Sequence, residues 1–162
     1  MGRRLLSNYL LTLKENKMKG KILIIEDDPN WQNDLRFYFE NDGFYVEVVS
    51  SLEEGISKIK KELFHFITID MRLDDDKDIN PEQFEGWKLL EVIKKLRVQE
   101  RTPVMVITGY GVEYKELKNI KNMESLFFME KGRDFDLKKL LEIVNMQVKR
   151  IDLRFNNDFR NV

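Results

Sequence analysis

Short apolar runs alternate with amphipathic segments along most of this chain. An unbroken apolar run that ends at a polar residue is typical of a strand buried on both faces, whereas apolar residues three or four positions apart indicate a helix with one buried face. The apolar runs predict five strands, at residues 21–26, 44–49, 63–69, 103–108 and 126–129. The amphipathic segments predict helices after Asp28, after Ser51, and at residues 84–97, 112–122 and 136–150.

Two of the predicted helices have recognisable beginnings. Asp28 followed by Pro29 suits an N-cap with proline at the first helical position, so Asp28 is expected to be a cap rather than a ligand. Four apolar residues follow at helical spacing and are expected to form the inward face of that helix: Trp31, Leu35, Tyr38 and Phe39. Ser51 and Glu54 form a capping-box pattern at the start of the next helix.

Strands separated by helices imply parallel βαβ units with right-handed crossovers. The predicted fold class is therefore α/β, a five-stranded parallel sheet in a doubly wound three-layer sandwich. The domain is expected to span residues 19–150, with an amino-terminal extension at 1–18 and a tail at 151–162. Leucine and tyrosine residues recur at helical spacing in the extension, which suggests a short amphipathic helix, although Met18 is an alternative start of translation.

Composition narrows the possible functions. Hydrophobic residues make up 42% of the 162, and the mean hydropathy is -0.48, which is typical of a soluble globular protein. Lys and Arg (28) nearly balance Asp and Glu (29), which argues against a nucleic-acid-binding surface. The absence of cysteine excludes disulfides and thiolate metal sites and fits a cytoplasmic protein. No apolar stretch is long enough to cross a membrane.

Polar residues follow the predicted strands and should meet at one edge of the sheet. They are Glu26, Asp27 and Asp28 after the first strand, Asp70 after the third, Thr108 at the end of the fourth and Lys131 after the fifth. Carboxylates crowd together only with a cation between them, and oxygen ligands without His or Cys favour Mg²⁺. A hydroxyl and an ammonium nearby would suit phosphate oxygens. The sequence therefore predicts a site where a carboxylate can carry a phosphoryl group.

The segments around these residues resemble a known family. KILIIEDDPNW, FITIDMRL, EGWKLLE, PVMVITGYG and FFMEKG occur in the order and near the spacing of the response-regulator receiver domain of two-component signalling. The resemblance covers about residues 19–150 and implies a flavodoxin-like strand order 2-1-3-4-5.

The resemblance also implies a role for each matching residue. Asp70 matches the phosphoacceptor, with Thr108 and Lys131 as the groups that contact the phosphoryl oxygens. Asp27 and Asp70, the backbone carbonyl of Arg72, and Glu26 through a water molecule match the Mg²⁺ ligands. Thr108 and Phe128 match the switch residues.

By the same resemblance, the chain would be a cytoplasmic response regulator rather than an enzyme. Since no DNA-binding or catalytic output domain follows Arg150, a single-domain regulator is expected. Its expected partner is a histidine kinase or histidine phosphotransfer protein. Its expected output is a protein target or a homodimer, through the face formed by residues 112–122, the fifth strand and the last helix. Neither a nucleic acid nor a membrane is an expected partner.

Two features depart from the family pattern. Gly132 follows Lys131 where the family usually has a proline after a cis bond, so the geometry of the Lys131–Gly132 bond is open. The stretch between Asp70 and Gly86 is also longer than usual, with an acidic insertion at residues 74–84 whose role is open.

Two alternative functions remain. Phosphatases of the haloacid-dehalogenase type use a similar set of groups, but their nucleophile follows the first strand and their acidic pair comes late in the chain. A receiver-like binding module that is never phosphorylated is the other alternative. His65, the only histidine, lies away from the acidic edge and is expected to be structural, which argues against Ser-His-Asp catalysis.

Overall fold

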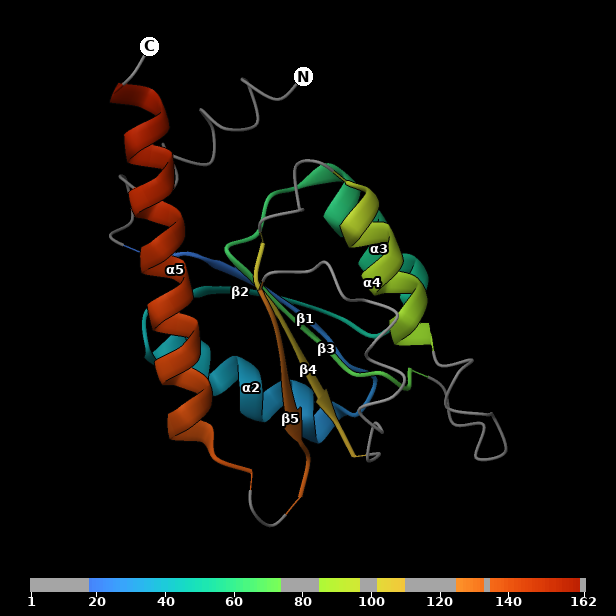
Figure 1. Ribbon diagram of the computed structural model, residues 1–162. Coiled ribbons are helices and arrows are strands. Elements are labelled where there is room, and N and C mark those ends of the chain that lie inside the picture. Colours follow the sequence, from blue (N-terminus) through green and yellow to red (C-terminus); the bar gives the residue numbers. More distant parts are fainter. Residues whose placement is uncertain (1–17, 74–84, 97–101, 110–124, 133–134, 161–162) are drawn as a thin grey trace.

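The computed structural model describes residues 18–73, 85–96, 102–109, 125–132 and 135–160 (Figure 1). The strands are β1 (Lys21–Ile25), β2 (Tyr45–Val49), β3 (Phe66–Ile69), β4 (Val104–Thr108) and β5 (Leu126–Glu130). The helices are α2 (Pro29–Asn41), α3 (Leu52–Lys61), α4 (Glu85–Lys95) and α5 (Leu137–Arg160).

All five strands pair in parallel, in the order β2-β1-β3-β4-β5, which confirms the predicted fold class and strand order. Strand β1 has β2 on one side and β3 on the other, so the order in which strands join the sheet changes direction between β1 and β3. In open α/β sheets, ligands bind outside the carboxyl ends of the strands at such a switch point. Ile25 and Ile69 are partners in the β1–β3 register, so the residues that follow them emerge side by side.

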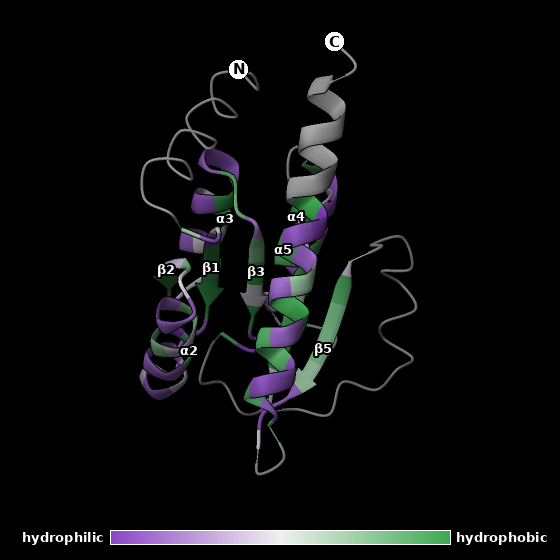
Figure 2. Ribbon diagram, turned by 90° about the vertical axis from the view of Figure 1, so that its left-hand side faces the viewer, coloured by the Kyte–Doolittle hydropathy of each residue, from purple (hydrophilic) through white to green (hydrophobic). Residues whose placement is uncertain are grey.

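Helices cover both faces of the sheet, as a three-layer sandwich requires (Figure 1). One apolar cluster joins the sheet to α3 and α4 through residues such as Ile59, Leu89 and Ile93. The other joins it to α2 and α5 through residues such as Phe39 and Val144. Figure 2 shows hydrophobic residues along the central strand β1 and hydrophilic residues on much of the covering helix α2.

The predicted helix beginnings are present, with one difference. The side chain of Asp28 accepts a hydrogen bond from the Asn30 N–H at 2.8 Å, as an N-cap does. Ser51 accepts from the Glu54 N–H at 3.3 Å. The carboxylate of Glu54 accepts a hydrogen bond from the Ser50 N–H at 3.1 Å, one residue before the cap itself.

Two details of the helices differ from the prediction. Tyr38, which the sequence predicts on the inward face of α2, is 39% exposed, because the buried row of this helix consists of Leu35 and Phe39 and Tyr38 lies at its border. Helix α5 continues to Arg160 instead of ending at Arg150. Residues 151–160 contain neither glycine nor proline, so no residue that strongly disfavours a helix ends it earlier. Residues 1–17 of the predicted extension and the predicted helix at 112–122 lie outside the described residues.

No helix in the described part of the chain combines the length and the apolar character that a membrane crossing requires.

His65 lies at the end of the sheet opposite the acidic residues and is fully buried. Its ring Nδ1 accepts a hydrogen bond from the backbone N–H of Lys21 at 2.8 Å. The backbone N–H of His65 donates to the carbonyl of Lys21, also at 2.8 Å. Gly20 packs so closely that a Cβ there would lie 2.9 Å from the Cγ of His65. This imidazole therefore joins the segment before β3 to the start of β1, in agreement with the predicted structural role.

Candidate functional site

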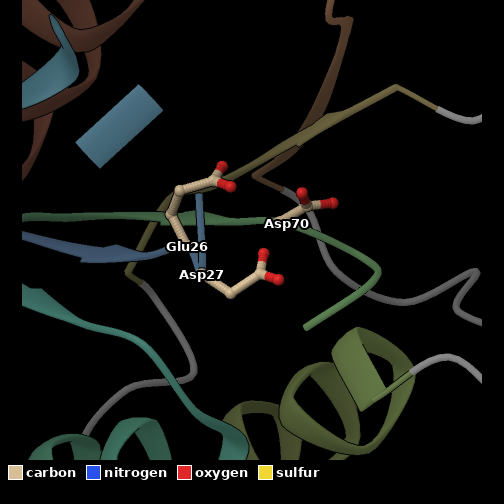
Figure 3. Close-up of side chains that lie close together, drawn as sticks. All are labelled: Glu26, Asp27 and Asp70. Atoms are coloured by element: carbon tan, nitrogen blue, oxygen red, sulfur yellow. The ribbon is translucent and has the colours of Figure 1, made fainter. Parts of the chain in front are cut away.

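The carboxyl groups of Glu26, Asp27 and Asp70 lie close together at the carboxyl edge of the sheet (Figure 3). Glu26 and Asp27 follow β1 directly, and Asp70 follows β3, so the pairing of these two strands brings them together. One oxygen from each carboxylate lies within 4.8 Å of the other two. The predicted meeting of acids from separate strands is therefore present.

Lys131 connects two of these carboxylates. Its Nζ lies 2.5 Å from Oδ2 of Asp70 and 2.8 Å from Oε1 of Glu26, and its side chain is only 11% exposed. Its backbone N–H donates to the carbonyl of Thr108 at 2.8 Å, which extends the pairing of β4 with β5 by one residue. The pairing of β4 with β5 thus places the Lys131 ammonium between Glu26 and Asp70, where its charge offsets the repulsion between the two carboxylates.

The buried acid beside Lys131 is strongly perturbed. Burial raises the pKa of Glu26 to about 7; hydrogen bonding from Lys131 acts in the opposite direction, and the negative charge of Asp70 adds to the rise. Burial acts to lower the pKa of Lys131, but the charges of Asp70 and Glu26 outweigh it, so that pKa is raised. Lys131 is therefore charged at neutral pH.

The remaining predicted site residues lie in β4, in β5 and in the segment after β3. Thr108 is buried at the end of β4. The backbone N–H of Arg72 donates to Oδ1 of Asp70 at 3.1 Å, so each oxygen of Asp70 receives a hydrogen bond. Phe128, in β5, is 38% exposed.

The Lys131–Gly132 bond, whose geometry the sequence left open, is trans, since the described residues contain no cis peptide bond. Gly132 has φ +148°, a backbone conformation that favours glycine, and a Cβ there would meet no atom of the described residues within 4 Å. The backbone at Gly132 therefore adopts a conformation that glycine permits, after a trans peptide bond.

The cluster suits a hard divalent cation. Glu26, Asp27 and Asp70 offer only oxygen atoms, which are the ligands that Mg²⁺ prefers, and a cation there would offset three crowded negative charges.

Comparison with known proteins agrees with this geometry. The model of a family described as the response regulator receiver domain matches residues 22–145. The chain belongs to this family. The matched part of the receiver domain includes the acidic cluster, which is typical of the family's phosphoacceptor site, together with Thr108 and Lys131. Receiver domains are typically phosphoacceptors rather than enzymes, and they interact with histidine kinases.

Curated relatives of this receiver domain are regulatory proteins. The transcriptional activator protein PfeR of Pseudomonas aeruginosa is 31% identical over 93 residues, which cover 57% of this chain and 27% of PfeR. The acid tolerance regulatory protein ActR of Rhizobium meliloti is 31% identical over 115 residues, which cover 71% of this chain and 54% of ActR. The chain thus spans about half of these relatives' length, or less.

Solved structures confirm the fold. A CheY-like response regulator receiver domain protein from Methanospirillum hungatei is 25% identical, with a TM-score of 0.67, and the match covers 83% of this chain and 97% of that one. The receiver domain of the sensor histidine kinase PA1611 from Pseudomonas aeruginosa is 18% identical, with a TM-score of 0.63 and coverage of 80% and 98%. That structure contains a magnesium ion coordinated in its active-site cleft.

The sequence pattern did not reveal the role of Gly86 beside the site. Its N–H donates to the carbonyl of Met71 at 3.0 Å, and a Cβ at this position would lie 2.7 Å from the Cα of Met71 and 3.0 Å from the carbonyl oxygen of Asp70. The first turn of α4 therefore packs directly on the backbone that carries Asp70.

Gly86→Ala is expected to destabilise the protein by about 1–3 kcal/mol, because two of the three nearest atoms belong to backbone and cannot turn away, while the third is the side-chain sulfur of Met71. Urea denaturation measures the loss. Gly109→Ala is the matched control, since among the described residues a Cβ there would meet only the Cβ of Lys131, at an ordinary 3.9 Å. Equal midpoints for Gly86→Ala and the wild type would show that α4 can shift without cost.

Proposed function

We propose that this receiver domain accepts a phosphoryl group on Asp70 from a histidine kinase or histidine phosphotransfer protein and passes the signal on by a conformational change. The observation that carries the proposal is the pair of Glu26 and Asp70 bound by one partly buried lysine, Lys131, beside the further acid Asp27. This arrangement provides a carboxylate nucleophile, ligands for a cation and an ammonium for phosphoryl oxygens in one place.

In the proposed transfer, an oxygen of Asp70 attacks the phosphorus of a phosphohistidine. The new O–P bond forms an acyl phosphate, the N–P bond breaks, and the imidazole nitrogen keeps the electron pair and is reprotonated. Lys131 and the hydroxyl of Thr108 would then donate hydrogen bonds to the phosphoryl oxygens. The contribution of these residues is position and charge, because phosphoryl transfer needs little else from the protein.

The proposed cofactor is Mg²⁺, held by Asp27, Asp70 and the backbone carbonyl of Arg72, with Glu26 acting through a water molecule. The support is the oxygen-only acidic cluster of this chain and the magnesium ion in the related receiver domain of PA1611. When bound, the ion would offset negative charge on the carboxylates and the transferring group.

The proposed switch uses Thr108 and Phe128. A phosphoryl group would draw Thr108 toward itself, and the exposed ring of Phe128 would turn inward. This would shift an existing equilibrium of the face that includes β5 and α5, through which a protein target or a second copy would bind. The proposed compartment is the cytoplasm.

A phosphorylation assay tests the proposal. The purified chain is incubated with acetyl phosphate, with and without Mg²⁺, and the intact mass is measured over time. We expect one phosphoryl group per chain, only with Mg²⁺. Continuous release of phosphate from a simple phosphate ester would favour a phosphatase instead. An unchanged mass under all conditions, also with a phosphorylated histidine phosphotransfer protein as donor, would favour a binding module.

Asp27→Ala is expected to weaken Mg²⁺ binding at least about tenfold, because the variant removes a direct oxygen ligand. Tryptophan fluorescence during a Mg²⁺ titration measures the affinity, and Asp34→Ala, at an exposed position on α2, is the matched control. A titration of Asp27→Ala that coincides with the wild type would remove Asp27 from the ligand set.

A further inference from the structure

The ammonium of Lys131 has a third neighbour besides the two acids. Its Nζ lies 5.2 Å from the centroid of the Trp31 ring, within the range of a cation–π interaction. Trp31 is in the first turn of α2, shortly after Glu26 and Asp27, and is half-buried. The ammonium is therefore enclosed by two carboxylates and the face of an indole.

The indole is itself held in place. The ring of Phe135 meets it edge to face, with centroids 4.9 Å apart and planes at 84°. Phe135 follows the loop that carries Lys131, and its N–H donates to the carbonyl of Gly132 at 3.2 Å. Both aromatic rings pack against the apolar cluster between α2, α5 and the sheet. Trp31 is therefore anchored to the core on one side and to the loop of Lys131 on the other.

We propose that Trp31 is a positioning residue for phosphoryl transfer, which holds the Lys131 ammonium at the site while its anionic partners change. This inference rests on the proposed function of Asp70. In that reaction Lys131 must exchange hydrogen bonds with carboxylates for hydrogen bonds with phosphoryl oxygens. The indole face attracts the ammonium but carries no net charge, so it neither competes for the phosphoryl group nor leaves when the acids change partners.

Enclosure strengthens this contact. Cation–π attraction is weak at exposed positions and several times stronger where water is excluded, and the Lys131 side chain is only 11% exposed. Among aromatic side chains, tryptophan has the most attractive face for a cation. Leucine at this position would fill part of the space but would leave the ammonium without that attraction.

The first measurement is the rate of phosphoryl uptake from acetyl phosphate with Mg²⁺. Trp31→Leu is expected to be slower than the wild type by roughly 2- to 30-fold. Trp31→Phe should fall between them, because a phenyl face attracts a cation less strongly. Phe39→Leu is the matched control: Phe39 is on the same helix and fully buried but lies in the apolar core, so its loss should lower stability and leave uptake unchanged.

The second measurement does not depend on phosphorylation. In a Trp87→Phe background, Trp31 is the only tryptophan, and Lys131→Met should change its emission, whereas Lys138→Met, at an exposed position on α5, should not. No emission change with Lys131→Met would overturn the contact. Uptake by Trp31→Leu at the wild-type rate, or slowed no more than by Phe39→Leu, would overturn the positioning role. If the wild type takes up no phosphoryl group while Lys131→Met still changes the emission of Trp31, the contact stands and the proposed function is refuted.

Discussion

Asp70→Asn is expected to abolish phosphoryl uptake while the protein stays folded. A carboxamide has no anionic oxygen to attack phosphorus and cannot form the acyl phosphate. The fold should tolerate the change because the side chain keeps its size and the backbone N–H of residue 70 still donates to the carbonyl of Ile25. Lys131 would keep Glu26 as its partner, so no buried charge is left unpaired.

Intact-mass measurement after incubation with acetyl phosphate and Mg²⁺ checks this prediction, with thermal denaturation to confirm folding. Asp136→Asn, at the start of α5, is the matched control and should be phosphorylated like the wild type. Wild-type incorporation into Asp70→Asn would place the phosphoryl group on another residue and refute the assignment of Asp70.

Acid is expected to destabilise the protein through His65. Burial lowers the pKa of His65 from its ordinary value of 6.5 to about 4. Between these values the unfolded chain binds a proton that the folded chain does not, so the free energy of unfolding falls as the pH falls from 6.5 to 4. At one pKa unit per 1.36 kcal/mol, the full loss is about 3 kcal/mol.

His65→Asn isolates this effect, because the amide oxygen of asparagine can accept the Lys21 N–H in place of Nδ1 but does not titrate. Urea denaturation at several pH values gives the slope of stability against pH, which should be smaller in the variant. The raised pKa of Glu26, about 7, acts in the opposite direction, since the folded chain then binds the extra proton. It is present in both proteins and therefore cancels in the comparison. Identical slopes would show that His65 titrates alike in the folded and unfolded chains.

The acidic cluster could be predicted because it depends on strand ends. Glu26, Asp27 and Asp70 each follow an apolar run, and parallel strands place such ends at one edge of a sheet. The neighbours of the cluster could not be predicted in this way. Trp31 has the spacing of an ordinary inward-facing residue of α2, and no local pattern indicates that its ring also faces Lys131, a hundred positions along the chain.

The sequence by itself therefore determined the five strands, most of the helices, the fold class and the edge at which the chemistry lies. These follow from periodicities and caps that act within a few residues. Only the tertiary structure decided that Lys131 binds both Glu26 and Asp70, that Gly86 contacts the backbone beside Asp70, and that the Lys131–Gly132 bond is trans. The physical reason is distance along the chain: these contacts join separate elements, and their geometry depends on how strands and helices pack rather than on any local preference.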